Sequence, residues 1–393
     1  MYNSLFINEN LDKGSHSEDS LKGIVECTNL IEAINYSTLY KSLGKGEFEK
    51  YIKNLITVNN IDLIFFGIGA GMIIDIFFIK ELTENFDVKI IIGFPDSEHL
   101  FEDVDRYYAQ AADIVWIYNP SLEKIFNMYG ISTFCSQGFD INRYKKTIIK
   151  KSIDVSFIGG VNRGKRKEYI DFLTLNGINV ELAGFGTERG VISTTEKNMI
   201  VCQSRINLNF TGVLNNDRNI YNRIKQPKGR PQEVSLLGSF VLSEYASGLE
   251  SMFNIGSEID LFDSKEELLS KIKFYLANGD LRESMASKAN MKAISLYETS
   301  YVVKKLLSAL EGEKKANKTY YLDPEFSSKF TSARFYYLVQ SFLHGNFKGM
   351  NQEMQSILRY RSVRLKNFYY DIPRAFYHFF KDLLRYTKKV GFE

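Results

Sequence analysis

Residues 228–267 read KGRPQEVSLLGSFVLSEYASGLESMFNIGSEIDLFDSKEE, and this stretch decides the fold class. Pro231 favours the first turn of a helix, because the N–H that it lacks would have no partner there, and Gly238 favours the end of that helix. Phe240–Leu242 and Ile259–Phe262 are short apolar runs of the kind that form buried strands. The stretch therefore predicts helices and strands in alternation.

Two more helices are expected within the same stretch. They begin after Ser247-Gly248 and after Asp263-Ser264, where polar side chains cap free N–H groups. The start of a helix attracts anions through these N–H groups and the helix dipole. Because Lys228 and Arg230 stand directly before Pro231, the stretch also predicts a site for an anionic small molecule such as a nucleotide.

The composition is that of a globular protein with room for two domains. The chain has 393 residues, of which 44% are hydrophobic, so it can form two full cores. A net charge of +3 is too small to indicate nucleic acid as the main partner. Cys27, Cys135 and Cys202 are far apart, which argues against disulfides and a Cys-based zinc site and fits the cytoplasm. We see no signal peptide, and Asp and Gly residues interrupt the apolar run 61–79, so we expect no membrane span there.

Strands alternate with helices through most of the chain. The first 60 residues are less regular, with a short strand expected at 5–7, loose helical spacing over 18–40 and an amphipathic helix over 48–58. Later strands are expected at 61–66, 88–94, 114–117 and 132–135, and then at 155–158, 180–183 and 206–210. Helices are expected between them, including 72–85, 103–111, 121–129 and 167–176. This rhythm is typical of parallel βαβ units.

The rhythm lapses in the basic segment 139–153, which we interpret as a linker. We therefore predict an α/β protein with two doubly wound domains, residues 1–150 and 151–300, and a helical extension, residues 301–393. Ligands of such sheets bind outside the carboxyl ends of the strands, so we expect a cleft between the domains to hold the site.

The chain ends in a basic amphipathic stretch, RAFYHFFKDLLRYTKKVGF. Apolar Phe376, Phe379, Phe380, Leu383 and Leu384 alternate with Arg374, Lys381, Arg385, Lys388 and Lys389. One interpretation is a helix that packs on the body of the protein or on a second subunit in a homo-oligomer. The other is a helix that lies on an anionic membrane surface.

Several segments together resemble bacterial glycosyltransferases of the GT-B fold. They include SFIGG, GFG, INLNF, GRPQEVSLLGSFVLSEYASGLESMF, GSEIDLF and EELLSKIKFYLAN. The chain is most similar to the "glycosyl transferases group 1"-like family that includes spore-maturation-type enzymes, over 61–303 and most densely over 155–301. The family's Arg-x-Phe-Glu motif is present as Arg230-Pro231-Gln232-Glu233, with Gln232 in place of the aromatic residue.

This resemblance implies a GT-B glycosyltransferase of hexosyltransferase type. It implies a nucleotide-sugar donor, UDP- or GDP-linked, on the second domain and a glycan, lipid-linked or protein acceptor on the first. It also implies no obligatory metal or other cofactor, and a role in bacterial surface polysaccharide or glycoprotein assembly. Two alternatives stay open: a catalytically silent relative that binds a nucleotide sugar or a glycan, and another enzyme of nucleotide sugars such as an epimerase.

Without a metal, Arg, Lys and backbone N–H groups must neutralise the leaving diphosphate. We assign Arg230 and Arg166 to the phosphates first, and Arg163 and Lys228 second, although surface charge is the usual role of such residues. Glu233 would accept the ribose hydroxyls, or else act as a helix-capping acid. Glycines after two strands would let the backbone approach the donor, or else serve as turn residues: Gly159, Gly160, Gly184 and Gly186.

The acceptor hydroxyl needs a base if the enzyme inverts the sugar configuration. We assign Asp96 and His99, which follow an apolar strand of the first domain together with Glu98. A capped loop that leads into a helix is the competing interpretation. Gly67, Gly69 and Gly71 form the corresponding loop one strand earlier. Asp103-Val104-Asp105 matches a metal motif, but acids are common at a helix start, and the four histidines show no ligand spacing, so we predict no metal site.

Overall fold

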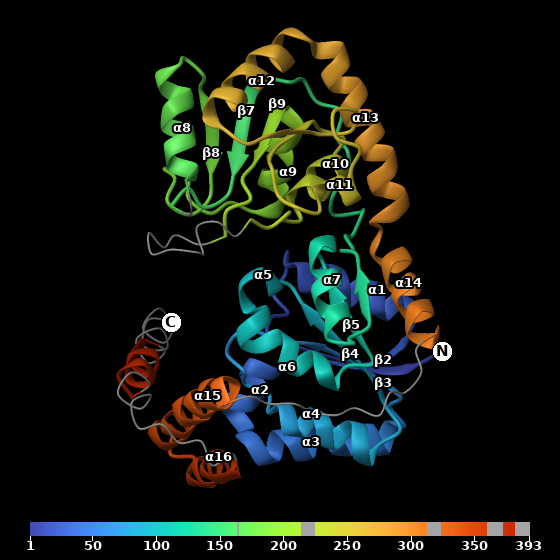
Figure 1. Cartoon of the computed structure of the whole chain (residues 1–393), viewed down its shortest axis with the longest axis vertical. Coiled ribbons are helices and arrows are strands. Elements are labelled where there is room, and N and C mark those ends of the chain that lie inside the picture. Colours follow the sequence, from blue (N-terminus) through green and yellow to red (C-terminus); the bar gives the residue numbers. More distant parts are fainter. Residues whose placement is uncertain (163–164, 214–224, 313–323, 360–371, 382–393) are drawn as a thin grey trace, which may run out of the picture.

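The computed structural model describes residues 1–162, 165–213, 225–312, 324–359 and 372–381, and it contains two parallel β-sheets (Figure 1). The first sheet has the order β2-β1-β3-β4-β5-β6. Its strands are β1 (Asn3–Asn8), β2 (Asn29–Asn35), β3 (Leu63–Gly67), β4 (Lys89–Phe94), β5 (Ile114–Ile117) and β6 (Thr133–Cys135). The second sheet has the order β11-β10-β9-β7-β8. Its strands are β7 (Ile153–Ile158), β8 (Val180–Ala183), β9 (Ser204–Asn209), β10 (Val241–Glu244) and β11 (Asp260–Phe262).

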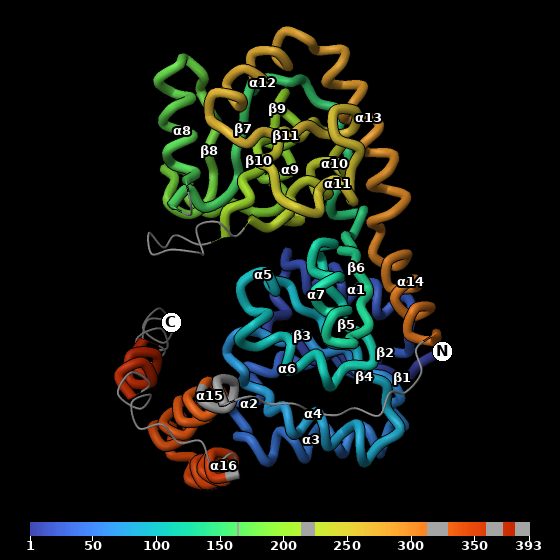
Figure 2. The backbone as a smooth tube through the Cα atoms, viewed as in Figure 1, coloured from blue at the N-terminus to red at the C-terminus, as the bar shows by residue number. Residues whose placement is uncertain are grey.

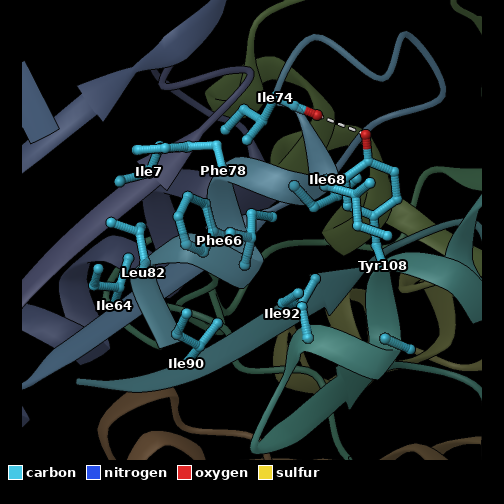
Figure 3. Packing of buried hydrophobic residues seen from close by; sticks show 14 of the residues in the cluster. Ile7, Ile64, Phe66, Ile68, Ile74, Phe78, Leu82, Ile90, Ile92 and Tyr108 are labelled. Carbon is cyan, nitrogen blue, oxygen red and sulfur yellow. Dashed lines mark hydrogen bonds between the residues drawn. The ribbon is translucent and has the colours of Figure 1, made fainter. Parts of the chain in front are cut away.

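Helices cover both faces of the first sheet. Alternate residues along β3 and β4 point to opposite faces, because side chains in a strand alternate with period two. Ile64, Phe66, Ile90 and Ile92 pack with α3 (Lys45–Asn59) and α4 (Ile76–Asn85), as Figure 3 shows for part of this cluster. Phe65, Ile91 and Trp116 pack on the opposite face, against α1 (His16–Cys27). The near-continuous apolar strands are thus explained by burial on two sides.

Shorter helical segments follow β4 and β5. They are α5 (Ser97–Leu100), a π-helical turn (Phe101–Asp105), α6 (Arg106–Tyr108), a 3₁₀ turn (Ala109–Ala111) and α7 (Pro120–Met128). Tyr108 from this region donates a hydrogen bond of 2.6 Å to the Ile74 carbonyl, drawn as the dashed line in Figure 3. These segments hold the loops at the carboxyl ends of β4 and β5 against the rest of the domain.

The second domain confirms the prediction from residues 228–267. The order is α10 (Arg230–Leu236), β10, α11 (Leu249–Met252), β11 and α12 (Lys265–Ala277). Gly238 ends the first helix at φ +66°, Gly248 precedes α11 at φ +104°, and the Ser264 side chain caps α12. The remaining helices of this domain are α8 (Arg166–Leu175), α9 (Thr194–Gln203) and α13 (Gly279–Leu296).

Both sheets reverse their strand order at an equivalent place. In the first sheet β1 lies between β2 and β3, and in the second β7 lies between β8 and β9. The crossover connections leave on opposite faces at such a point, so a crevice opens at the carboxyl ends of the two strands. The two crevices lie after Asn8 and Gly67 in the first domain, and after Ile158 and Asn209 in the second.

The chain crosses between the domains twice, and the crossings are hydrogen-bonded together. The Phe139 N–H donates to the Tyr297 carbonyl at 2.8 Å, and the Thr299 N–H donates to the Phe139 carbonyl at 3.0 Å. After the second crossing, α14 (Thr299–Gly312) packs against α1 of the first domain. The α15 (Pro324–Leu343) and α16 (Phe347–Arg359) helices follow and lie beside α2 (Tyr36–Leu43) and α3 (Figure 2).

Three expectations about secondary structure need correction. The helix expected at 72–85 begins at Ile76, because the Asp75 side chain accepts the Phe77 N–H and caps it there. The loose helical spacing over 18–40 resolves into α1, the strand β2 and the start of α2. The helix expected over 103–111 is irregular, with π and 3₁₀ turns at its two ends.

Candidate active site

A cavity of about 480 Å³ lies at the carboxyl ends of the first sheet, and we call it the N-terminal pocket. Residues that follow β1, β3, β4 and β5 line it, as do the first residues of α1 and the loop that leads into α10. Its polar lining residues include Asn8, Glu9, Asn10, His16, Asp96, Glu98, Asn119, Gln137, Gln226 and Lys228. Phe6, Phe65, Ile91 and Trp116 supply apolar surface. The pocket thus occupies the crevice of the first sheet and receives residues from both domains.

Gln226 joins the second domain to the loop after β4. Its amide nitrogen lies 3.0 Å from the Pro95 carbonyl oxygen, 3.1 Å from Asp96 Oδ1 and 3.1 Å from Glu98 Oε2. The Lys228 ammonium donates to the Gln226 amide oxygen at 2.7 Å. Lys228 itself has φ +60°, a left-handed conformation that is uncommon outside glycine. This contact closes one side of the N-terminal pocket.

Asp96 and Glu98 both line the pocket, as the strand-end position predicts. Asp96 is exposed, whereas Glu98 accepts a hydrogen bond of 2.9 Å from the Asn119 amide. Burial raises the pKa of Glu98 above its ordinary value. A carboxylate with a raised pKa beside a cavity has the properties of a general base or acid, and Glu98 shares this place with Asp96.

His99 is not among the residues that line the pocket. It follows Glu98 in α5, and among the described residues its Nδ1 atom is buried without a hydrogen-bond partner. Asp105, behind this turn, is buried and accepts a hydrogen bond of 2.6 Å from the Ser97 hydroxyl. Burial raises the pKa of Asp105 to about 7. Of the two predicted catalytic residues, Asp96 thus lines the pocket and His99 does not.

Glu233 lies at the centre of a buried charge cluster that the two domains build together. Arg230 donates to its carboxylate at 2.8 Å, and Lys197 from α9 donates at 3.1 Å. Tyr144 from the linker contributes a hydroxyl at 3.3 Å, and His16 from α1 places Nε2 at 3.8 Å. Burial opposes ionisation, yet the charges of Arg230, Lys197 and His16 lower the pKa of Glu233 to about 2.

Lys197, Tyr144 and His16 are members of the cluster that the sequence did not reveal. They precede Glu233 by 36, 89 and 217 positions and belong to α9, the linker and α1. No local motif connects them. The one available signal is the histidine after Gly14-Ser15, directly behind the strand expected at 5–7.

Arg166 lies across the crevice of the second sheet. Its guanidinium donates to the Gly160 carbonyl at 2.8 Å and to the Gly212 carbonyl at 3.0 Å, and it lies 5.7 Å from the centre of the Phe157 ring. It therefore ties the loop after β7 to the loop after β9. Only 8% of Arg166 is exposed, so its guanidinium holds the loops that would surround a donor. Arg163 lies outside the described residues.

The predicted glycines of the second domain permit a close approach of two loops. Gly184 has φ +127°, and a Cβ atom added there would lie 2.5 Å from the Gly159 carbonyl oxygen. Gly186 has φ +84°. Gly160 continues the same loop as Gly159 and lies next to the exposed Phe185. These loops form the edge of the second sheet that would face a donor.

No group of three or more His, Cys, Asp or Glu side chains in the described part of the chain is placed to hold a metal ion. In the Asp103-Val104-Asp105 segment, Asp103 forms an ion pair with Lys329, and Asp105 is bonded to Ser97. The two carboxylates thus have separate partners. None of the described helices is both long enough and apolar enough to cross a membrane.

Solved structures of other proteins share this architecture. HepE from Anabaena in complex with UDP-glucose aligns with a TM-score of 0.57 and 14% identity, over 79% of this chain and 100% of that chain. Sucrose-phosphate synthase from Thermosynechococcus elongatus aligns with a TM-score of 0.54 and 10% identity, over 79% and 98%. The chain has the GT-B fold. A glycosyltransferase from Rickettsia africae is a third GT-B neighbour of this protein, with a TM-score of 0.54 and 11% identity over 79% and 98%.

A sequence comparison matches the second domain of this GT-B protein to a known family of sequences. Residues 165–308, from the start of α8 into α14, match the family model described as "Glycosyl transferase-like". The predicted resemblance to group 1-like glycosyltransferases is confirmed for this segment, whereas the spore-maturation group stays a prediction. No curated protein matches the chain.

Proposed function

We propose that this protein is a glycosyltransferase that moves a sugar from a nucleotide-diphosphate sugar to an acceptor hydroxyl. One observation carries the proposal: the N-terminal pocket is walled by residues of both GT-B domains, and its wall from the second domain, Gln226–Gly229, leads directly into Arg230. An acceptor in this pocket would lie beside the residues that we assign to the donor. Holding two substrates side by side raises the rate, because the entropy of bringing them together is lost on binding and not in the reaction step.

The donor would lie on the second domain. Arg230 and Lys228 supply positive charge for the diphosphate, and Gly159, Gly160, Gly184 and Gly186 form the loops that would approach it. UDP- and GDP-sugars are the donors we expect, and HepE, a neighbour in fold, is solved with UDP and with UDP-glucose. The Glu233 carboxylate forms ion pairs with Arg230 and Lys197. Its role in donor binding would therefore be to hold these two cationic side chains in position.

The acceptor would lie in the N-terminal pocket, with Asp96 as the base that removes the proton from its hydroxyl. Asp96 is exposed in the pocket lining, and the neutral Gln226 amide lies 3.1 Å from its Oδ1 atom. A glycan, a lipid-linked saccharide or a protein would each present such a hydroxyl, in bacterial surface polysaccharide or glycoprotein assembly.

A panel of UDP-, GDP- and CMP-sugars tests the function. We expect one nucleotide to raise the melting temperature and one nucleotide sugar to release its nucleotide when acceptors are supplied. Arg230→Gln should weaken the nucleotide-induced shift, whereas Arg205→Gln, a surface pair with Asp154 on the same domain, should leave it unchanged. A shift without release would favour the catalytically silent relative, and no shift with any nucleotide would refute the donor site.

Membrane contact through the C-terminal helix is a second proposal. Residues 372–381 form a helix on which Ile372, Phe376, Tyr377 and Phe380 are exposed, next to Arg374 and Lys381. Exposed apolar side chains beside basic ones favour the surface of anionic lipid. Leu383, Leu384, Arg385, Lys388 and Lys389 lie outside the described residues. Sedimentation with vesicles that contain anionic lipid, against vesicles of neutral lipid, would test this contact.

A further inference from the structure

The N-terminal pocket carries a further inference about the chemical class of the acceptor, which rests on the proposed function. The charged side chains in its described lining are three carboxylates, Glu9, Asp96 and Glu98, and one ammonium, Lys228, with His16 as the imidazole. Recognition of a phosphate normally uses Arg forks, Lys or free backbone N–H groups. The surplus of carboxylates makes this pocket unfavourable for an anion.

The glycine loop after β3 does not compensate for this charge. The Ile68 N–H donates to the Gly93 carbonyl at 3.3 Å, and the Gly69 N–H donates to the Tyr36 hydroxyl at 3.3 Å. The Met72 N–H donates to the Gly69 carbonyl at 3.2 Å. These three N–H groups are already used within the protein, so they are not free to cradle a phosphate.

Gln137 indicates what the pocket binds instead. It follows β6, lines the pocket and is 5% exposed, yet its side-chain amide makes no hydrogen bond to any described residue. An amide that opens into a pocket and has no protein partner is available to both donors and acceptors of a ligand. Asn119 in the same wall is fully engaged with Glu98 and Ser121, so the free amide of Gln137 is a local exception. A ligand that both donates and accepts hydrogen bonds would satisfy it.

The backbone around Gln137 keeps this amide in place. A Cβ atom added at Gly229 would lie 2.8 Å from the Gln137 amide oxygen, so the second domain approaches this side chain with bare backbone. Trp116, whose indole N–H donates to the Ser136 carbonyl at 2.6 Å, lies next to it in the lining. Aromatic and apolar surface beside amides and carboxylates suits the C–H faces and hydroxyls of a sugar ring.

We infer that the N-terminal pocket binds a polyhydroxylated group without negative charge, such as a neutral or amino-bearing sugar unit, and that it excludes phosphorylated ones. Hydroxyl groups would donate to Glu9, Asp96 and Glu98 and would pair with both ends of the Gln137 amide. The volume of about 480 Å³ is within the range of about 300–1,000 Å³ for small-molecule sites. Gln137 is thus a specificity-determining residue for the acceptor.

Direct binding to the whole chain tests this inference without relying on transfer. The probes are glucose, N-acetylglucosamine and glucosamine, each compared with its phosphate ester, by saturation-transfer NMR and calorimetry in the presence of UDP. We expect at least one free sugar to bind and its phosphate ester to bind about tenfold more weakly or not at all, because like charges in one pocket repel. Gln137→Leu should weaken the binding of the free sugar about three- to tenfold, which is the effect of one lost hydrogen bond.

The Glu9→Lys variant provides the opposite test. Glu9 is exposed at the pocket mouth, so the change should let the phosphate ester bind about tenfold better relative to the free sugar. Equal or tighter binding of the ester to the natural chain, no binding of any free sugar, or no effect of Glu9→Lys on the ratio would each overturn the inference. Loss of the UDP-induced thermal shift would instead point to failure of the donor site, and it is measured separately.

Discussion

A buried carboxylate paired with two cationic side chains, as Glu233 is with Arg230 and Lys197, has two linked effects. It fixes the side chains of Arg230 and Lys197, and it depends on them for its own ionisation. Removing one member leaves the other charges buried and unpaired, which is more costly than losing an exposed ion pair. Variants of this cluster therefore need a stability measurement beside any measurement of nucleotide binding.

We expect Glu233→Gln to lower the free energy of unfolding by about 3–5 kcal/mol at pH 7. The pKa of Glu233 in the folded chain is about 2, below the value of about 4.3 in an unfolded chain. Its contribution is therefore complete above pH 4.3 and is lost as the pH falls toward 2. Urea unfolding at pH 7 and at pH 3.5 should show a smaller difference between variant and parent at the lower pH.

The exposed residue Glu168 provides the control for this prediction, because its pair with Lys265 at 3.3 Å lies at the surface. Glu168→Gln should change the free energy of unfolding by at most about 1 kcal/mol. A Glu233→Gln variant that is as stable as the parent at pH 7 would show that the cluster contributes no stability. Glu233 would then be free to serve the donor alone.

The buried carboxyl of Asp105 should make the free energy of unfolding depend on pH in the opposite direction. Burial raises its pKa to about 7 in the folded chain, so folding binds a proton between about pH 4 and pH 7. The free energy of unfolding should consequently fall as the pH rises through this window. Asp105→Asn keeps the shape but removes the titration, so the variant should gain stability relative to the parent between pH 5 and pH 8.

Urea unfolding at these two pH values measures the effect. Glu102→Gln, a change at an exposed acid in the same helical turn, should leave the pH dependence of the parent intact. If Asp105→Asn shows the same pH dependence as the parent, another group titrates in this window. The prediction that Asp105 titrates in this window would then be wrong.

At the scale of elements, the local pattern determined most of the second domain. Pro231, Gly238 and Gly248 mark the ends of α10 and α11 by conformational preferences that do not depend on the tertiary structure. In the first domain β2 escaped prediction, because Asn29–Asn35 is an edge strand with half-exposed residues and no apolar run. Edge strands are specified by their neighbour more than by their own residues.

The C-terminal helices also depend on partners far away in the sequence. Arg334 of α15 is fully buried and donates to the Ile73 carbonyl at 2.8 Å, and also to the Met72 carbonyl. It contacts the Tyr40 hydroxyl at 3.1 Å and the Glu353 carboxylate at 3.4 Å. Met72 has φ +47°, so Arg334 holds a strained turn directly behind the glycine loop of the N-terminal pocket.

We expect Arg334→Met to lower the free energy of unfolding by about 3–5 kcal/mol, because it leaves the buried Glu353 carboxylate without its cationic partner and takes a donor from two buried carbonyls. The double variant Arg334→Met, Glu353→Met should recover part of this loss, since the uncompensated charge is then removed as well. Urea unfolding of both variants measures the difference. Equal destabilisation in the two variants would mean that the carbonyl contacts, and not the charge pair, dominate.

At the scale of the whole molecule, the candidate site could not be predicted from the sequence because residues of both domains form it. The sequence places Asp96 after a strand and Lys228 before a helix, and both positions indicate a site. Only the arrangement of the two domains brings Gln226 between these two residues. His16 reaches Glu233 across the same boundary. The sequence could indicate which residue types lie at strand ends, and the domain contact decides which of them meet.

Besides the approach of His16 to Glu233, three contacts among the described residues bear on this arrangement. The crossings at Phe139 and Thr299 pair with each other, and Arg143 of the linker forms an ion pair with Asp19, a fully buried residue of α1. Gln226 makes the third contact, in the lining of the N-terminal pocket. The first two lie where the chain connects the domains, so they act as a hinge, and Gln226 acts as the contact that closes the cleft.

Gln226→Ala should therefore open the cleft without unfolding either domain. The variant loses the amide that holds Pro95, Asp96 and Glu98, while the crossings at Phe139 and Thr299 remain. Small-angle X-ray scattering should show a larger radius of gyration than in the parent, and the melting temperature should change little. Gln203→Ala, on α9 and away from the pocket lining, is the matched control and should scatter like the parent. Unchanged scattering for Gln226→Ala would show that the remaining contacts hold the domains closed, and the amide would then serve only to orient Asp96 and Glu98 in the pocket.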